Sequence, residues 1–348
     1  MTALTQRAGA RPAARISLAL VLAVGLLVAI GAMALLALSL GTPQLSLADR
    51  DKILFQGGGT RLARIVVLQL RLPRLLMALM AGSMLALAGV ALQDSLRNAL
   101  AGPELLGVSA GASIVIAAIT IFHIPVLLTV FPFLALAGGM LAGAFVILTM
   151  RRLGDPVRLV LMGVAVNALL YAGIISITVL GSQTDVSVLY LFLLGSLANR
   201  TWPYVQLVAP WALIGIPLAL LAARPLNLLQ LGDEVAEGLG LRVVRMRLWL
   251  ALLSAGLVAA VVAACGPISY ISLAAPHLAR RLLRTTDARA VLPIAALIGA
   301  ALLLGADLLA KNLLDPLELP VGIWTTVIAG PVLVLLLRRQ LGGPRSRA

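Results

Sequence analysis

The chain has 348 residues, of which 61% are hydrophobic and 11% are charged, whereas soluble domains average about 45 to 50% apolar and about 25% charged residues. Together with a mean hydropathy of +1.08, this composition excludes an ordinary soluble protein and predicts an all-α, polytopic membrane helix bundle. A spanning helix needs about 20 apolar residues. The length therefore allows about ten spans, which we expect to form a single transmembrane domain over residues 1–348.

The formal net charge is +14, carried by 25 arginines and two lysines. In a soluble protein this balance would suggest a nucleic-acid partner, but the arginines here stand singly or in pairs at the ends of apolar runs. Such positions are typical of basic residues that set the orientation of membrane spans. We therefore expect a lipid bilayer, and no nucleic acid, around this chain.

Ten apolar windows follow one another along the chain. They cover residues 16–40, 72–92, 105–122, 128–150, 158–181, 205–223, 247–266, 268–283, 291–311 and 320–338. The first window follows Arg7, Arg11 and Arg15, as the apolar part of a signal peptide would. It is too long for one and lacks a clear cleavage site, so we interpret it as a span. The windows 105–122 and 268–283 are short, which favours half-helices or tilted segments.

The basic residues between the spans predict which side is cytoplasmic. With ten spans and both termini in the cytoplasm, 19 of the 27 basic residues fall inside and 8 fall outside, as the positive-inside rule requires. This orientation also places the one long polar interruption, residues 225–247, in the cytoplasm. Because it combines acids, arginines and the helix-breaking Gly238 and Gly240, we interpret it as a docking platform.

Four arginines on the outer side run against that rule. Arg61 and Arg64 lie in the external loop, and Arg71 and Arg74 flank Pro73 where the second span begins. One interpretation is that the pair beside Pro73 snorkels and helps to set the start of the helix. The alternative is a basic patch that receives acidic residues of an external partner.

Other polar features of the sequence favour structure over chemistry. Residues 182–204 contain an apolar stretch too short to span, which predicts a short helix that dips towards a pore. Asp307 is the one acid well inside a predicted span, and Lys311 follows it on the same helical face. This spacing predicts a structural pair near the outer surface and argues against an ion relay. Glycines within the spans, such as Gly82, predict close helix packing.

The sequence lacks the motifs of an enzyme or a nucleotide-binding protein. It has no phosphate-binding loop of the Walker type, no nucleophile elbow and no carboxylate pair suited to acid–base catalysis. His123 and His277 have no Cys, His or carboxylate companions at ligand spacing. We therefore expect no catalytic residue and no metal site, and a bundle without its own energy source needs a motor on another chain.

Several motifs in one order resemble the permeases of ATP-binding-cassette (ABC) importers for iron-siderophores, haem and vitamin B12. They are Arg71-Leu72-Pro73-Arg74, Arg97-Asn98-Ala99-Leu100-Ala101, Leu105 to Ala112, Leu231-Gly232-Asp233-Glu234 to Leu239-Gly240, Gly266-Pro267-Ile268-Ser269, Ala275-Pro276-His277, Ala306-Asp307 and Glu318 to Gly322. The resemblance covers about residues 65–340. The chain departs from the family at Ala99, where the cytoplasmic turn usually has proline, and at Lys311, where some members have arginine.

The resemblance implies partners on every side of this chain. It implies a ten-span subunit paired with itself or with a similar permease, two copies of a cytoplasmic ABC ATPase below, and a periplasmic substrate-binding protein above, in the bacterial inner membrane. ATP and magnesium would belong to the ATPase, so no cofactor and no enzyme activity is expected on this chain.

The resemblance also implies which residues make these contacts. Arg71 and Arg74, helped by Lys311, would receive glutamates of the binding protein. The ATPase-coupling loop would fold into two short helices and includes Leu231, Gly232, Asp233, Glu234, Ala236, Leu239 and Gly240. We interpret Asp233 and Glu234 as ATPase contacts or helix-start charges, and Arg242, Arg245 and Arg247 as holding the inner end of the next span.

The expected function is ATP-driven import of a ferric siderophore by alternating access. The fifth and tenth spans would line the path, with Asn167 and Tyr171 as candidates, although these residue types also pack ordinary helix interfaces. Haem and vitamin B12 are alternative cargoes within the family. An ion-coupled secondary transporter is the alternative from another class.

Overall fold

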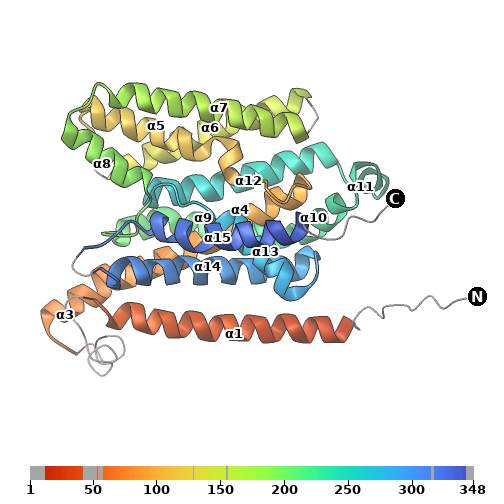
Figure 1. The fold of residues 1–348 in the computed structure, drawn as a ribbon, viewed down its shortest axis with the longest axis horizontal. Helices are drawn as coiled ribbons and strands as arrows, with labels where there is room; N and C mark the ends of the chain where they lie inside the picture. The colour runs from red at the N-terminus through yellow and green to blue at the C-terminus, as the bar shows by residue number, and fades with distance from the viewer. Residues whose placement is uncertain are drawn as a thin grey trace, which may run out of the picture.

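The computed structural model describes residues 12–41, 53, 58–127, 129–153, 156–314 and 317–341, and every regular element in these ranges is helical. Figure 1 shows the long helices running side by side along one axis. The short helix α3 (Arg61–Ile65) lies at one end of this bundle, and α10 (Ala223–Gln230) and α11 (Asp233–Gly238) lie at the other. We call these the α3 end and the α11 end.

The described helices match the predicted windows closely. Seven are long and apolar enough to cross a membrane: α1 (Pro12–Ser39), the continuous helix that ends in α4 (Leu72–Ser95), α6 (Phe131–Leu153), α7 (Pro156–Thr178), α9 (Trp202–Leu221), α12 (Val243–Cys265) and α14 (Ala288–Asn312). The three remaining windows form α5 (Val108–Ile121), α13 (Ile271–Leu283) and α15 (Val321–Leu341). This arrangement confirms an all-α membrane bundle with a helix count near ten.

The second span begins earlier than the sequence predicts. Instead of starting at Pro73, one helix runs from Arg61 to Ser95 through α3, the π-helix η1 (Val66–Arg71) and α4. In it the N–H of Leu72 donates to the carbonyl of Val67, five residues back. A proline inside an ordinary α-helix clashes with the preceding turn and lacks a donor. The wider π turn provides the room, so Pro73 does not end the helix.

The core of the bundle lies around α4 and α12, which are mostly buried. α4 packs against α14, α12, α9 and α13. Gly82 of α4 faces Gly299 of α14 so closely that a methyl group on either residue would collide with the other's backbone. This contact confirms that glycine serves close helix packing here.

The segment after α7 forms the expected short helix, α8 (Gln183–Leu193). Its first turn is closed by a capping box, in which the Ser182 hydroxyl accepts from the N–H of Asp185 and the Asp185 carboxylate accepts from the N–H of Ser182 at 3.1 Å. The short helix is thus confirmed, whereas its approach to a pore stays a prediction.

Candidate functional sites at the two ends of the bundle

At the α11 end, the polar interruption of the sequence folds into the two short helices α10 and α11. Gly232 joins them with a φ of +110°, and Gly240 ends the segment with a φ of +85°. Residues other than glycine rarely adopt backbone conformations with a positive φ. We call residues 223–240 the α10–α11 loop. The resemblance implies two short helices over Leu231 to Gly240, and the structure places α11 in that range and α10 directly before it.

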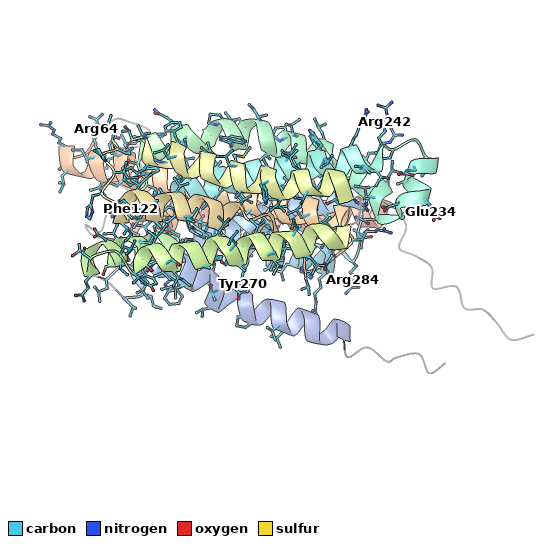
Figure 2. All side chains as sticks on the ribbon, turned by 90° about the horizontal axis from the view of Figure 1, so that it is seen from above. Arg64, Phe122, Glu234, Arg242, Tyr270 and Arg284 are labelled. Atoms are coloured by element: carbon cyan, nitrogen blue, oxygen red, sulfur yellow. The ribbon has the colours of Figure 1, made fainter. Side chains whose placement is uncertain are left out.

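One face of this loop is apolar and exposed. Leu231, Val235 and Leu239 are 60%, 50% and 61% exposed and follow one another at four-residue spacing, while Ala236 is fully buried against the bundle. Glu234 is exposed beside them, and Figure 2 shows it at the tip of this end. An exposed apolar stripe with acids around it is typical of a protein-contact surface. The sequence prediction omitted Val235, although its four-residue spacing from Leu239, the C-cap residue of α11, places both on one helical face.

The carboxylate of Asp233 turns inward to arginines of this chain. Arg247 donates to both of its oxygens, at 2.6 Å and 2.7 Å, and Arg97 donates to Oδ1 at 2.9 Å. The hydrogen bonds from Arg247 lower the pKa of the Asp233 carboxyl below its usual value, although its partial burial opposes this effect. Asp233 thus remains charged at neutral pH and is engaged within the chain.

Arg247 joins three elements through one guanidinium group. It lies in the first turns of α12 and is 3% exposed. Besides binding Asp233 of α11, its Nε donates to the carbonyl of Ser95, the last residue of α4, at 2.8 Å. We call these contacts the Arg247 clamp. Arg247 holds the end of α12 that lies next to α11, and the cytoplasmic location of this end stays a prediction. Its two partners had no local sequence signal.

α10 is attached separately, to the start of α14. Asn227 donates to Oδ1 of Asp287 at 2.6 Å and accepts from the N–H of Ala288 at 2.7 Å. Gln230 donates to the carbonyl of Thr286 at 3.1 Å. The α10–α11 loop is therefore attached to the start of α14 through Asn227 and Gln230, and to α4 and α12 through Arg247. Gln230 also hydrogen-bonds Asp94 of α4.

At the α3 end, Arg71 fastens α1 to the long helix that contains α4. The Arg71 side chain is buried, with the residue 5% exposed, and donates to the carbonyls of Leu38, Ser39 and Gly41 at 2.8 to 3.0 Å. The last carbonyls of a helix have no partners within it. Arg71 supplies the missing hydrogen-bond donors for the end of α1. Its role in this structure is therefore to hold two helices together.

Arg74 connects α4 to α14 and to the segment before α15. It donates to both oxygens of Asp307 at 3.0 Å and to Glu318 at 2.9 Å. The sequence pairs Asp307 with Lys311, whereas the structure gives Asp307 a hydrogen-bonded pair with Arg74. Lys311 instead donates to the carbonyl of Leu40 at 2.7 Å.

The three predicted docking residues do come together at the α3 end. Arg71, Arg74 and Lys311 line one cavity of about 120 Å³, together with Glu318. All three basic groups donate to partners within this chain. Their role in docking an external protein stays a prediction.

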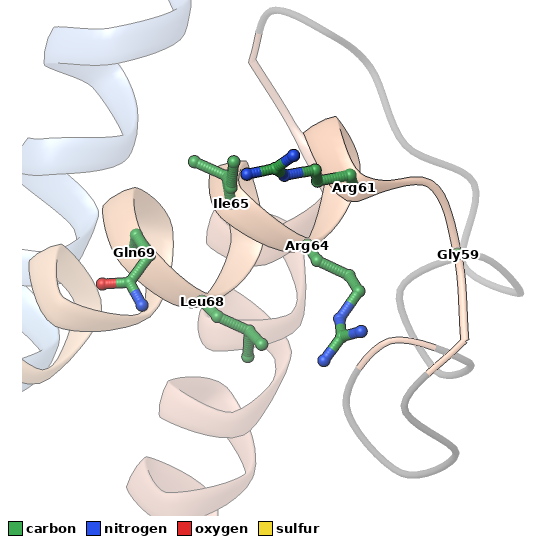
Figure 3. A pocket seen from close by; sticks show the side chains of 6 residues that line it. All are labelled: Gly59, Arg61, Arg64, Ile65, Leu68 and Gln69. Atoms are coloured by element: carbon green, nitrogen blue, oxygen red, sulfur yellow. The ribbon is translucent and has the colours of Figure 1, made fainter.

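Arg61 and Arg64 differ from the arginines next to them. Both side chains are exposed on α3, and neither forms an ion pair with any residue that the structure describes. They line a cavity of about 590 Å³ beside Gln69, as Figure 3 shows. Arg64 marks the α3 end in Figure 2. These two arginines supply accessible positive charge at this end.

The two candidate path residues lie one turn apart on α7. Asn167 donates its side-chain amide to the carbonyl of Glu104 in η2 (Pro103–Leu106), and Tyr171 is 44% exposed. The Asn167 side chain is therefore engaged in a hydrogen bond between α7 and η2, and Tyr171 is the more accessible of the two. Leu169 and Ile175 of the same helix are 73% and 64% exposed, so α7 carries exposed apolar side chains.

Within the part of the chain that the structure describes, no group of three or more His, Cys, Asp or Glu side chains could hold a metal ion. His277 lies on α13 with Nδ1 at 2.7 Å from the carbonyl of Leu273. His123 is exposed, and its Nε2 lies 3.2 Å from Oδ1 of Asp185. These contacts give each histidine a local partner.

A bundle of about ten apolar helices, with a paired-helix loop at one end, defines a multi-pass membrane protein of the transporter class. The sequence profile of the FecCD transport family matches residues 18–339. The chain belongs to this family, whose members are the permease subunits of ABC importers for iron chelates. In such importers the ATPase is a separate subunit, and the permease itself is not an enzyme.

Individual relatives agree with this assignment. The chain is 43% identical over 277 residues to the Fe(3+) dicitrate transport system permease protein FecD of Escherichia coli (strain K12), covering 79% of this chain and 86% of that protein. It is 42% identical to the hemin transport system permease protein HmuU of Yersinia pestis, covering 78% and 83%. A structure described as an inward-facing conformation of a metal-chelate type ABC transporter superposes with a TM-score of 0.80 at 28% identity, covering 91% and 98%.

Proposed function

We propose that this chain carries a ferric siderophore across the bacterial inner membrane by alternating access, driven by two copies of an ABC ATPase. A second permease subunit, identical or similar, and a periplasmic substrate-binding protein complete the complex. The observation that carries the proposal is the α10–α11 loop, a pair of short helices whose apolar face has no covering element among the described residues. Membership of the FecCD family supports the same conclusion.

The proposal places the α11 end in the cytoplasm. The start of α1 and the end of α15 lie towards that end in Figure 1, and the majority of basic residues falls on that side of the predicted spans. With this orientation both termini are cytoplasmic, and the α3 end faces the periplasm.

The ATPase would bind the apolar face of the α10–α11 loop. Burying a side chain of the size of leucine or valine contributes about 1.5 to 3 kcal/mol. Leu231, Val235 and Leu239 together therefore offer enough apolar surface to dominate a small docking contact. Glu234 would lie at the rim of this docking contact and favour a partner with a basic residue opposite it, because charges at the rim of an interface mainly govern the association rate and the choice of partner.

The binding protein would dock at the opposite, basic end. The helix from Arg61 to Ser95 has 35 residues, which corresponds to about 50 Å, whereas the hydrocarbon core is about 30 Å thick. If Ser95 lies near the inner boundary, α3 stands clear of the outer boundary. Arg61 and Arg64 are thus accessible to acidic residues of a periplasmic protein, beside the cavity that Arg74 and Lys311 line.

The cargo is proposed from the relatives. A ferric siderophore fits the similarity to FecD and to the iron(3+)-hydroxamate import system permease protein FhuG of Bacillus subtilis (strain 168). Haem is the second candidate, because HmuU is about as similar as FecD. In a dimer, the exposed face of α7 with Tyr171 would line the path.

The test is purification of the tagged chain from its own cells, followed by uptake measurements in proteoliposomes. We expect an ABC ATPase to copurify and ATP to drive uptake of one ferric chelate from a panel of ferric citrate, ferric hydroxamate and hemin. Uptake that needs only an ion gradient, by a chain that purifies without an ATPase, would instead support a secondary transporter.

A matched pair of variants locates the ATPase contact. Leu239→Asp at the α11 end should abolish copurification of the ATPase. Leu62→Asp at the α3 end, where the side chain is similarly exposed at 65% against 61%, should leave it unchanged. Equal effects of the two changes would contradict the assignment of the α10–α11 loop.

A further inference from the structure

We propose that Arg247 is the positioning residue through which movement of the α10–α11 loop reaches α4 and α12. This inference rests on the proposed function and deepens it, because it assigns the mechanical link between the ATPase-binding loop and the spans to one side chain. The link consists of Asp233 on α11, the Arg247 guanidinium on α12 and the carbonyl of Ser95 on α4.

The geometry of the clamp restrains orientation as well as distance. The two parallel hydrogen bonds from Arg247 to Asp233, at 2.6 Å and 2.7 Å, form the bidentate fork that only arginine can supply. α11 therefore cannot tilt on α12 without breaking at least one of them. The Arg247 side chain is 3% exposed and the Asp233 side chain is 37% exposed. A break is therefore costly on the side of Arg247, whose buried guanidinium loses a partner that water does not replace.

The clamp ends on the helices best placed to transmit a displacement. α4 and α12 form the buried core of the bundle and pack directly on each other. At its far end α4 carries Arg74, which holds Asp307 of α14, and the same helix carries Arg71, which holds α1. A shift of α11 thus has a continuous route of packed and hydrogen-bonded groups to the α3 end.

Neighbouring contacts are poorer candidates for this role. Arg97 also binds Asp233, but its side chain is 45% exposed, and exposed ion pairs contribute little. Asn227 connects α10 to Asp287 at the start of α14 through an exposed contact. Gln230 of α10 hydrogen-bonds Asp94 of α4, which attaches α10 to α4, whereas Arg247 attaches α11 to both α4 and α12. Arg247 is the buried member of the set.

The test compares conservative changes in the clamp with a matched control. Arg247→Lys keeps the charge but loses the fork, and Asp233→Asn keeps the volume but loses the charge. Arg245→Lys is the control, because Arg245 lies two residues earlier on α12, is exposed, and has no ion pair with a described residue. Each complex is purified with its ATPase, and ATP hydrolysis and chelate uptake are measured in the same proteoliposomes.

We expect both clamp variants to assemble and hydrolyse ATP while the chelate imported per ATP falls about tenfold, within the range usual for coupling between sites. The control variant Arg245→Lys should import as much chelate per ATP hydrolysed as the unchanged chain. Because the two residues act as one unit, the double variant should be no worse than the single ones. Additive losses would contradict a shared link.

Two other outcomes overturn the proposal. One is an unchanged ratio in both clamp variants. The other is loss of assembly or thermal stability while the remaining complex keeps a normal ratio, because the clamp would then be purely structural. Failure of the proposed function is distinguishable, since the unchanged chain would itself show no ATP-dependent uptake.

Discussion

Buried arginines hold helices together at both ends of the bundle, but the two ends differ in what they leave exposed. At the α3 end, Arg71 and Arg74 face inward and hold α1, α4 and α14 together, although the sequence resemblance predicted that they dock a binding protein. At the α11 end, Arg247 also faces inward, but the loop that it holds leaves Leu231 and Leu239 exposed, as a docking surface requires. Burial and intrachain hydrogen-bond partners, more than residue type, therefore decide whether a motif residue is available to another protein.

The difference also has an energetic side. Breaking a buried ion pair by removing one partner costs about 3 to 5 kcal/mol, because the other charge is left without compensation, whereas an exposed pair contributes about 1 kcal/mol or less. Changes among the inward-facing groups should therefore affect stability, and changes among the exposed groups should affect partners.

The largest expected effect is on stability at the α3 end. Asp307→Ala leaves the Arg74 side chain, 13% exposed, with Glu318 as its remaining carboxylate. We expect a loss of about 3 kcal/mol, seen as a clear drop in the apparent Tm in detergent. Glu318→Ala is the control: because that side chain is 40% exposed, it should cost about 1 kcal/mol or less. Equal drops would mean that the network does not depend on burial.

A smaller effect is expected in the backbone of the α10–α11 loop. Gly238 and Gly240 both have open space where a Cβ would stand, but only Gly240 has a positive φ, +85°. Gly240→Ala should therefore destabilise the loop by about 1 kcal/mol. Gly238→Ala should be neutral or slightly stabilising, because alanine is the better helix former.

Trypsin cleavage after the exposed Arg242 reports this difference, since cleavage requires local opening of the loop. The Gly240 variant should be cut faster than the unchanged chain and the Gly238 variant no faster. Similar cleavage rates for the two variants would show that packing on the bundle, and not the positive φ of Gly240, determines the conformation of the loop.

Much of the fold could be predicted because hydrophobicity alone defines a span. The predicted windows agree with the helices to within a few residues in most cases, since an apolar segment in lipid must satisfy its backbone internally. The exception is the start of the second span. The effect of Pro73 depends on whether the preceding turn widens, which local composition does not reveal.

The site was predictable only where the information is local. The four-residue spacing of Val235 and Leu239 indicates a shared face of α11, and Val235 could have been found in this way. The pairing of Asp233 with Arg247, or of Arg74 with Asp307, joins residues that the fold alone brings together. Such pairs leave no periodic pattern in the sequence. The sequence therefore shows a charged residue without showing whether it is paired within the chain.

The smallest expected effect on stability comes from reversing the exposed charge of α3. Arg61→Glu combined with Arg64→Glu reverses the accessible charge of α3 without breaking an ion pair among the described residues. We expect the Tm to stay unchanged and the affinity for the periplasmic binding protein to fall by about two- to thirtyfold, because two exposed pairs at about 0.2 to 1 kcal/mol each are lost. The loss should shrink at high ionic strength, where exposed charges are screened.

Arg245→Glu, an equally exposed reversal at the α11 end, is the control and should not alter that affinity. Lys311→Glu separates the two outer surfaces, because Lys311 belongs to the cavity that Arg71 and Arg74 line. If Lys311→Glu weakens binding while the α3 reversal does not, the binding protein must reach the inward-facing arginines and displace partners such as Glu318. If the α3 reversal weakens binding, docking at this end begins on side chains that the family motif does not include.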